Sequence, residues 1–120
     1  MPEISYKPGH IWISGRSIIL EPGILYNNLL DNFHRYIANP LDQTEIHISL
    51  DYMNSASNRH LMNFLILAEK LYSQGKKVDV FWYFDPSDEM SREQGTIFKD
   101  LLELPFHLIE QADFNKPNTN

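Results

Sequence analysis

The chain has 120 residues, of which 42% are hydrophobic, and a formal net charge of −6 from 16 acidic and 10 basic side chains. This length favours one compact domain over residues 1–120, and the hydrophobic content is sufficient for a core. The acidic balance disfavours non-specific nucleic-acid binding, which requires a basic face. The absence of cysteine excludes disulfides, thiolate catalysis and cysteine-based zinc sites.

The beginning of the chain, Met1–Ser5, lacks the basic and apolar regions of a signal peptide. No apolar run approaches the roughly 20 residues that a helix needs to cross a bilayer. We therefore expect a cytoplasmic protein with protein partners and no membrane contact.

The first part of the chain predicts a β-hairpin. Glu3–Tyr6 and His10–Ser14 indicate two short strands, and Lys7-Pro8-Gly9 has the composition of a turn. Gly15-Arg16-Ser17 indicates a further turn, and Glu21-Pro22-Gly23 indicates a break in the chain. The hairpin predicts antiparallel pairing at one side of a sheet.

Helices and strands are predicted to alternate over the rest of the chain. Apolar residues at helical spacing indicate three helices: about Leu25–Ala38, about Ser57–Ser73, and a third that follows the loop and helix start Asp85–Glu89 and runs to about Leu102. β-branched and aromatic runs indicate three strands, over Thr44–Leu50, Lys77–Phe84 and Phe106–Glu110. The tail from Gln111 to Asn120 is polar and expected to be frayed.

This order predicts an α/β fold: a single domain with a mixed β-sheet, about three α-helices and right-handed crossovers between parallel strands. The aromatic strand Lys77–Phe84 is expected to be central. The polar side chains of Glu45, His47 and Ser49 alternate with apolar ones, which predicts that one face of the sheet is not fully covered.

The third predicted helix has two features that bear on packing. Its inward-facing side chains are predicted to be Met90, Ile97, Phe98, Leu101 and Leu102. Gly95 within it costs about 1 kcal/mol relative to alanine, which indicates close packing or a kink.

The turn Asn54-Ser55-Ala56-Ser57 lies between a predicted strand and a predicted helix. Asn and Ser are residue types that cap helices, so one interpretation is purely structural. The other is a phosphate acceptor, because the free N–H groups and partial positive charge of a helix start stabilise a phosphate. Spacing alone does not separate the two interpretations.

An acidic cluster follows the strand Lys77–Phe84, and its members are Asp85, Asp88, Glu89 and Glu93. Ligands bind at the carboxyl edge of open α/β sheets, and carboxylates there bind Mg²⁺. The structural alternative is an acid-rich helix start that complements the helix dipole. The cluster therefore leaves open a magnesium-dependent phosphate-ester enzyme, a phosphate-binding domain or a docking surface.

Other catalytic patterns have little support. Asp51 has the strand-end position of a receiver phospho-aspartate, but the acidic pair and the lysine of a receiver are missing. The five histidines are scattered and form no metal-binding pair. We expect no metal site and no cofactor.

Two motifs match a known pattern in order and spacing. Tyr52 to Met62 reads Y-M-N-S-A-S-N-R-H-L-M, where the pattern has Y-x-N-T-S-S-S-K-x-L-L. Trp82 to Phe98 corresponds to W-Y-Y-D-x-x-D-E-D-M-x-E-x-G-E-x-F, and Leu101 to Phe106 contains the leucine pair and the L-P-F that follow. On these residues the chain resembles the SiaC family of bacterial regulatory phosphoproteins, known from biofilm regulation. The likeness covers most of the chain and is loosest before Thr44.

The resemblance implies a fold like that of STAS-type anti-sigma-factor antagonists and a switch protein without enzymatic activity. It implies phosphorylation by a partner protein kinase at Ser55, with Ser57 as the alternative acceptor, and reversal by a PP2C-like phosphatase. It further implies that the unmodified form binds and stimulates an effector such as a diguanylate cyclase, raising cyclic-di-GMP. The expected partner-binding residues are Asn54, Ser55, Ser57, Arg59, Asp85, Asp88 and Glu89.

Three positions depart from the family pattern. Ser55 replaces threonine, which keeps the hydroxyl, and Ala56 removes a neighbouring one, leaving Ser57 as the local competitor. The family's S-Y-P-E-N is not intact, and Ser17 to Pro22 stands roughly in its place. The departures bear on kinase preference and on any partner contact made by residues 17–22.

Overall fold

A computed structural model describes residues 3–16, 22–51 and 55–111, with side chains over 4–15, 27–50 and 58–111. Five strands and three helices follow the predicted order. The elements are β1 (Glu3–Lys7), β2 (His10–Arg16), α1 (Pro22–Ile37), β3 (Gln43–Asp51), α2 (Ser55–Ser73), β4 (Lys77–Phe84), α3 (Glu89–Leu101) and β5 (Phe106–Glu110).

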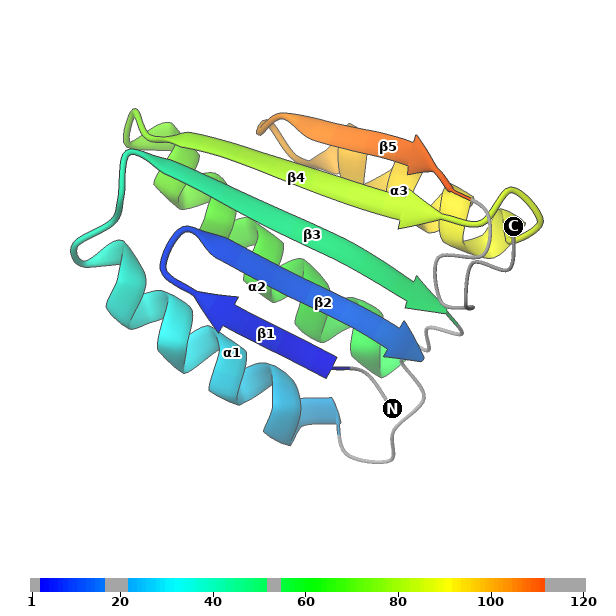
Figure 1. Ribbon diagram of the computed structural model, residues 1–120, viewed down its shortest axis with the longest axis horizontal. Helices are drawn as coiled ribbons and strands as arrows, with labels where there is room; N and C mark the ends of the chain where they lie inside the picture. The colour runs from blue at the N-terminus through cyan, green and yellow to red at the C-terminus, as the bar shows by residue number, and fades with distance from the viewer. Residues whose placement is uncertain (1–2, 17–21, 52–54, 112–120) are drawn as a thin grey trace, which may run out of the picture.

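The five strands form one mixed sheet in the order β1-β2-β3-β4-β5 (Figure 1). β1 and β2 form the predicted antiparallel hairpin, and β2 to β5 are parallel. The predicted α/β class with a mixed sheet and three helices is therefore confirmed. β4 is an interior strand, but the middle position belongs to β3, so the prediction that Lys77–Phe84 is central holds only in part.

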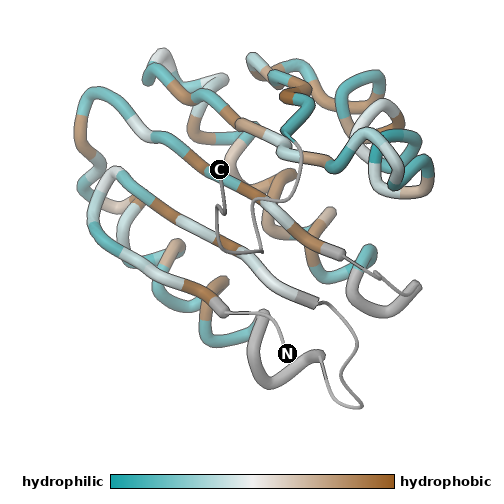
Figure 2. Tube along the Cα trace, turned by 45° about the vertical axis from the view of Figure 1, so that its right-hand side comes forward, coloured by the Kyte–Doolittle hydropathy of each residue, from teal (hydrophilic) through white to brown (hydrophobic). Residues whose placement is uncertain are grey.

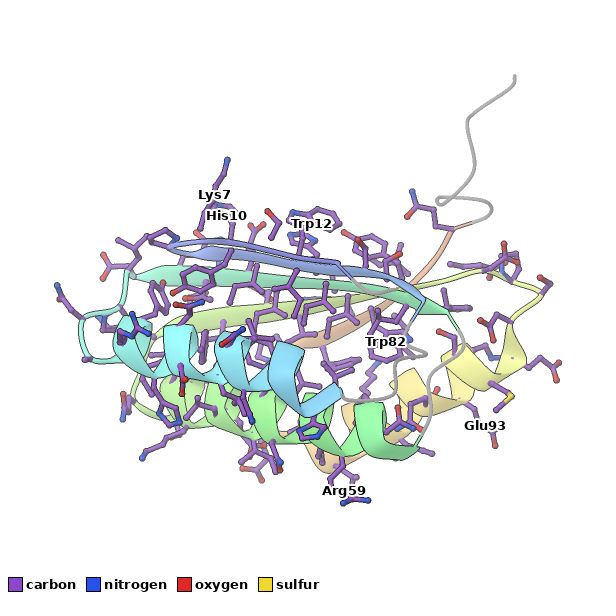
Figure 3. The ribbon with its side chains drawn as sticks, turned by 90° about the horizontal axis from the view of Figure 1, so that it is seen from below. Lys7, His10, Trp12, Arg59, Trp82 and Glu93 are labelled. Carbon is purple, nitrogen blue, oxygen red and sulfur yellow. The ribbon has the colours of Figure 1, made fainter. Side chains whose placement is uncertain are left out.

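In the described part of the chain, all three helices cover the same face of the sheet and no helix covers the other, as Figures 1 and 3 show; we call this second face the open face. In Figure 3, Lys7, His10 and Trp12 project from the open face, whereas Arg59 and Glu93 lie on the outer side of the helix layer. This arrangement confirms the uncovered face that the polar alternation of β3 predicted. It gives the molecule two separate surfaces, one of sheet and one of helices.

The core lies between the sheet and the helices. Ile46, Ile48 and Leu50 of β3 point into it, and so do Val78, Val80, Trp82 and Phe84 of β4. Hydrophilic and hydrophobic residues alternate along the strands in Figure 2 because successive side chains of a strand point to opposite faces. From the helices, the fully buried side chains include Leu29, Phe33, Leu61, Phe64, Leu65, Ala68 and Leu71.

The predicted inward face of α3 is wrong for three residues. Met90, Leu101 and Ile97 are 77%, 62% and 46% exposed. The buried side of α3 consists instead of Ser91, Gly95 and Phe98, followed by Leu102 after the helix. Small residues face the sheet here, so α3 approaches β4 and β5 closely and turns its larger apolar side chains outward.

Gly95 shows how close this approach is. A β-carbon at position 95 would lie 2.6 Å from Cδ1 and Nε1 of Trp82 and 2.8 Å from Cδ2 of Leu108. The Trp82 indole packs into this space and donates its N–H to the Ser91 carbonyl at 3.0 Å. The prediction that Gly95 marks close packing is confirmed.

Several boundaries differ from the predicted ones. β2 continues through Gly15 and Arg16, which were predicted to form a turn; Gly15 has a φ of 100° yet stays in register with Leu50 of β3. Pro22 and Gly23 begin α1 rather than break the chain, because proline suits the first turn of a helix. Residues 17–21 and 112–120 lie outside the described residues.

Candidate functional site

The predicted switch region lies at the carboxyl edge of the sheet. β3 ends at Asp51 and β4 ends at Phe84, and these two strands are parallel neighbours. The helices that follow them, α2 and α3, therefore begin at the same edge. A hydrogen bond from Asn58 Nδ2 to Gln94 Oε1 at 3.1 Å joins the first turns of α2 to the middle of α3. The two sequence motifs, separate along the chain, are thus brought together.

The structure places α2 two residues earlier than the predicted start at Ser57. The helix begins at Ser55, so both Ser55 and Ser57 belong to its first turn. Their side chains and the whole of Asn54 lie outside the described part of the chain. Arg59 stands one turn after Ser55 on the exposed side of α2, and Figure 3 shows it directed away from the sheet.

The acidic residues of the β4–α3 turn have local structural roles. The carboxylate of Asp85 accepts from the Ser87 backbone N–H at 2.8 Å and from the Ser87 hydroxyl at 2.6 Å. Asp88 is the N-cap of α3, and its Oδ1 accepts from the Ser91 N–H at 3.0 Å. Glu89, in the first turn of α3, is exposed and complements the helix dipole.

This geometry favours a structural use of the carboxylates over a metal site. Among residues 3–16, 22–51 and 55–111, no three His, Asp or Glu side chains are grouped so that they could hold a metal ion. The magnesium-dependent alternative therefore gains no geometric support from the side chains that the structure describes. Asp85, Asp88 and Glu89 lie between the end of β4 and the first turn of α3, at the carboxyl edge of the sheet.

The open face carries a row of aromatic rings that crosses four strands. Trp12, His47, Phe81 and His107 are partners in register from β2 to β5. The His47 ring stacks on Trp12 with centroids 4.1 Å apart and on Phe81 at 4.8 Å, and Phe81 stacks on His107 at 5.0 Å. The row shields His47, which is only 9% exposed, whereas Trp12 at its end is 43% exposed.

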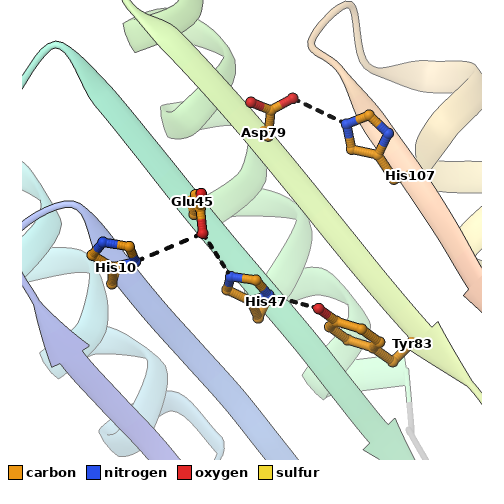
Figure 4. A network of polar contacts seen from close by, with 6 residues as sticks. All are labelled: His10, Glu45, His47, Asp79, Tyr83 and His107. Carbon is orange, nitrogen blue, oxygen red and sulfur yellow. Dashed lines mark hydrogen bonds and ion pairs between the residues drawn. The ribbon is translucent and has the colours of Figure 1, made fainter. Parts of the chain in front are cut away.

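Polar contacts hold this row in place (Figure 4). His47 Nε2 lies 3.2 Å from Glu45 Oε1, and His47 Nδ1 lies 2.9 Å from the Tyr83 hydroxyl. A carboxylate oxygen accepts, so Nε2 is the donor to Glu45; in the tautomer with its proton on Nε2, Nδ1 accepts from the Tyr83 O–H. Burial, and secondly the charge of Glu45, raise the pKa of Tyr83 above its ordinary value.

Two histidine–carboxylate pairs flank the row. His10 Nδ1 lies 3.7 Å from Glu45 Oε1, and His107 Nε2 lies 3.0 Å from Asp79 Oδ1. The sequence interpretation treated the histidines as scattered and missed this network. Alternation in β3 already placed Glu45 and His47 on one face, but only the register of β2, β4 and β5 brings the other members to them.

None of the helices in the part of the chain that the structure describes is both long and apolar enough to span a bilayer.

Together these features describe a small two-layer α/β domain in which two helix starts share one sheet edge, beside carboxylates used as caps. The model of the SiaC family regulatory phosphoproteins matches residues 1–111. The chain therefore belongs to the SiaC family of regulatory phosphoproteins, as the two motifs predicted.

Known proteins from Pseudomonas aeruginosa extend the comparison. An uncharacterized protein of strain UCBPP-PA14 is 25% identical over 101 residues, which are 84% of this chain and 80% of that protein. A chain in the crystal structure of the diguanylate cyclase SiaD with its activator SiaC is similar with a TM-score of 0.85 and 24% identity, over 92% of this chain and 93% of that one.

A structure of SiaC alone gives a TM-score of 0.84 at 23% identity, over 92% of this chain and 90% of that chain. At such identities the two structures establish the shared fold.

Proposed function

We propose that this protein is a non-enzymatic switch that is phosphorylated on Ser55 by a partner protein kinase and restored by a PP2C-like phosphatase. In this proposal the unmodified form binds and stimulates a diguanylate cyclase and so raises cyclic-di-GMP. Membership of a family of regulatory phosphoproteins supports the general role. The likeness to a chain in the SiaC–SiaD complex structure supports a cyclase as the effector.

The observation that carries the proposal is the start of α2 at Ser55, at the edge that α3 also shares. Backbone N–H groups of a first helical turn have no intrahelical partner and stabilise a phosphate. These N–H groups would therefore stabilise a phosphate on Ser55 without a change of fold. Ser57 offers a second hydroxyl in the same turn and is the alternative acceptor.

The switch acts through charge at a contact surface. Phosphorylation adds about −1.5 to −2 charges at pH 7. The edge already carries Asp85, Asp88 and Glu89, so the added charge increases a negative potential rather than neutralising a positive one. An effector that packs against a neutral Ser55 would have to desolvate a dianion after phosphorylation, which is strongly unfavourable. Binding is lost while the domain stays folded.

The test begins with the kinase. The protein is incubated with ATP and the candidate kinase, and intact-mass and peptide mass spectrometry locate the phosphate. We expect one phosphate on Ser55, none on the Ser55→Ala variant, and undiminished labelling of the matched Ser57→Ala variant. Labelling of Ser57 alone would move the switch to that residue, and no labelling by an active kinase would overturn the proposal.

Binding to the diguanylate cyclase encoded in the same genome completes the test. Ser55→Ala should bind it and stimulate cyclic-di-GMP synthesis even in the presence of kinase and ATP, and Ser55→Asp should bind it poorly. If both variants bind like the native protein, residue 55 only begins the helix.

A further inference from the structure

The outer surface of the helix layer carries apolar side chains that the core does not use. On α3 these are Met90, Ile97 and Leu101, which are 77%, 46% and 62% exposed. Their spacing of seven and four residues places them on one side of the helix. This side lies next to the buried residues Phe98 and Leu102, so the apolar surface continues outward from the core.

α2 contributes to the same surface. The two helices run in the same direction side by side (Figure 1), held by the Asn58–Gln94 hydrogen bond and, further along, by a bond from the Glu103 N–H to Glu69 Oε2 at 2.6 Å. Between these two links α2 presents Met62, which is half-buried, and Ile66, which is 48% exposed. Counted along the two helices from these links, they lie at the level of the α3 segment that contains Ile97 and Leu101.

The border of this surface is acidic on α3, whereas on α2 it holds the exposed basic residues Arg59 and Lys70, seven residues before and four after Ile66. Glu89, Glu93 and Asp100 are exposed and form one stripe along α3 beside the apolar one, because they too are spaced by four and seven residues. Figure 3 shows Glu93 on the outer side of the helix layer. The surface therefore matches a partner with an apolar stripe that is bordered by lysine or arginine along the edge facing α3. An amphipathic helix in a helix-on-helix contact has these properties.

We propose that Met62 and Ile66 of α2, with Met90, Ile97 and Leu101 of α3, are the docking surface for an amphipathic, basic-edged helix of the effector protein. The proposal rests on the proposed function, because it assigns the contact surface of the same switch. The surface begins within a turn of Asn58, itself three residues after Ser55. A phosphate on Ser55 would thus stand at one end of the docked helix.

The acidic border attracts the partner whether or not Ser55 is phosphorylated, so the phosphate weakens binding only at the Ser55 end of the contact. The basic edge of the partner would be attracted by Glu93 and Asp100 along the helix in both states. The dianion at Ser55 would still have to be desolvated where the two proteins meet. Docking therefore depends on the apolar stripe for affinity and on the edge at Ser55 for control.

The docking surface can be tested at exposed positions, because substitutions there leave the core intact and a change in Kd then reports on binding. Leu101→Glu and Ile97→Glu, made in the Ser55→Ala background, should weaken binding to the full-length diguanylate cyclase from the same genome at least about tenfold in Kd. Leu41→Glu is the matched control: Leu41 is 52% exposed, but it lies before β3 at the opposite edge of the sheet. It should bind like its parent.

Charge and contact are tested separately. Neutralising the border with Glu93→Gln and Asp100→Asn should slow association and reduce its dependence on salt. A photo-crosslinking amino acid at position 97 should attach to a cyclase segment that has an apolar helical stripe with flanking Lys or Arg. Crosslinks to a strand or an acidic segment, or between two copies of this chain, would overturn the proposal.

The two proposals fail in different ways. If Ser55→Ala binds the cyclase and the Leu101→Glu and Ile97→Glu changes leave Kd unaltered, the docking surface is wrong while the switch stands. If Ser55→Ala itself does not bind the cyclase, the proposed effector is wrong, and the surface assigned to it falls with it.

Discussion

At the scale of single residues, Gly95 sets the distance between α3 and the sheet. Alanine there would gain about 1 kcal/mol in helix propensity. Its β-carbon would meet Trp82 at 2.6 Å and Leu108 at 2.8 Å, and the indole is held by its bond to Ser91. We expect the clash to prevail and Gly95→Ala to lower the free energy of unfolding by about 1–3 kcal/mol, as overpacking does. Urea unfolding measures the change.

The control for this substitution is Thr96→Ala, on the exposed side of the same helix. Thr96 is exposed and donates its hydroxyl to the Arg92 carbonyl at 2.9 Å. Its removal should change stability by less than about 0.5 kcal/mol. Equal effects of the two substitutions would show that helix propensity, and not the Trp82 contact, decides the result.

Tyr83 is the residue whose environment predicts a dependence on pH. Its pKa is raised in the folded protein, first by burial and then by Glu45. The folded chain therefore holds the phenol proton more tightly than the unfolded chain. The resulting stability is fully present below the unfolded pKa near 10 and is lost as pH rises through the higher folded pKa. Tyr83→Phe should flatten this alkaline loss.

The measurement is urea unfolding at a series of pH values from neutral to above 10. At neutral pH, Tyr83→Phe should cost about 0.5–1.5 kcal/mol, because the hydroxyl no longer donates to His47. Some alkaline loss should remain, since burial also raises the pKa of Tyr6. An unchanged slope in Tyr83→Phe would contradict the prediction.

At the scale of elements, the start of α3 tests whether Asp88 acts as a helix cap or as a ligand for Mg²⁺. Asp88 caps the helix through the Ser91 N–H. Asp88→Ala should therefore lower the unfolding free energy by about 0.5–2 kcal/mol, the usual cost of a lost N-cap. Glu89→Ala, one residue on and exposed, should cost less. Differential scanning fluorimetry with and without Mg²⁺ would contradict the cap role if the native protein were stabilised by the ion and Asp88→Ala were not.

The elements were largely predictable because each has a strong local signal. The strands Lys77–Phe84 and Phe106–Glu110 have the predicted bounds, since β-branched and aromatic residues lie between clear turn signals. Local signals failed where a residue has two uses. Pro22 both interrupts a chain and starts a helix, and Gly15 adopts a positive φ without ending its strand.

The orientation of α3 was the larger error, and its cause is instructive. Periodicity placed the large apolar residues inward, whereas the buried stripe is Ser91, Gly95, Phe98 and Leu102. Small residues at helical spacing can mark the buried side of a helix, just as large apolar residues can. The open-face network was equally hidden, because it depends on strand register, which alternation within one strand does not define.

At the scale of the whole molecule, the two layers divide the work. The open sheet face holds a row of stacked rings with the hydrogen bonds of His47 to Glu45 and Tyr83, and the helix layer presents the apolar stripe and the acidic border of α3. Ser55 starts the helix that links the sheet edge to the second of these surfaces. A change at Ser55 is therefore three residues from Asn58, whose hydrogen bond to Gln94 joins α2 to α3.

This division predicts how phosphorylation acts on the whole domain. One phosphate takes the net charge from −6 to about −8, a modest change for a folded chain of this size. The urea m-value should stay unchanged, because it follows the surface exposed on unfolding. In amide NMR spectra, shifts should be confined to the starts of α2 and α3, with the Trp12 indole signal unmoved. Shifts spread over β2 to β5 would mean that the switch alters the fold itself, and binding would then be lost through rearrangement rather than through the desolvation of a charge.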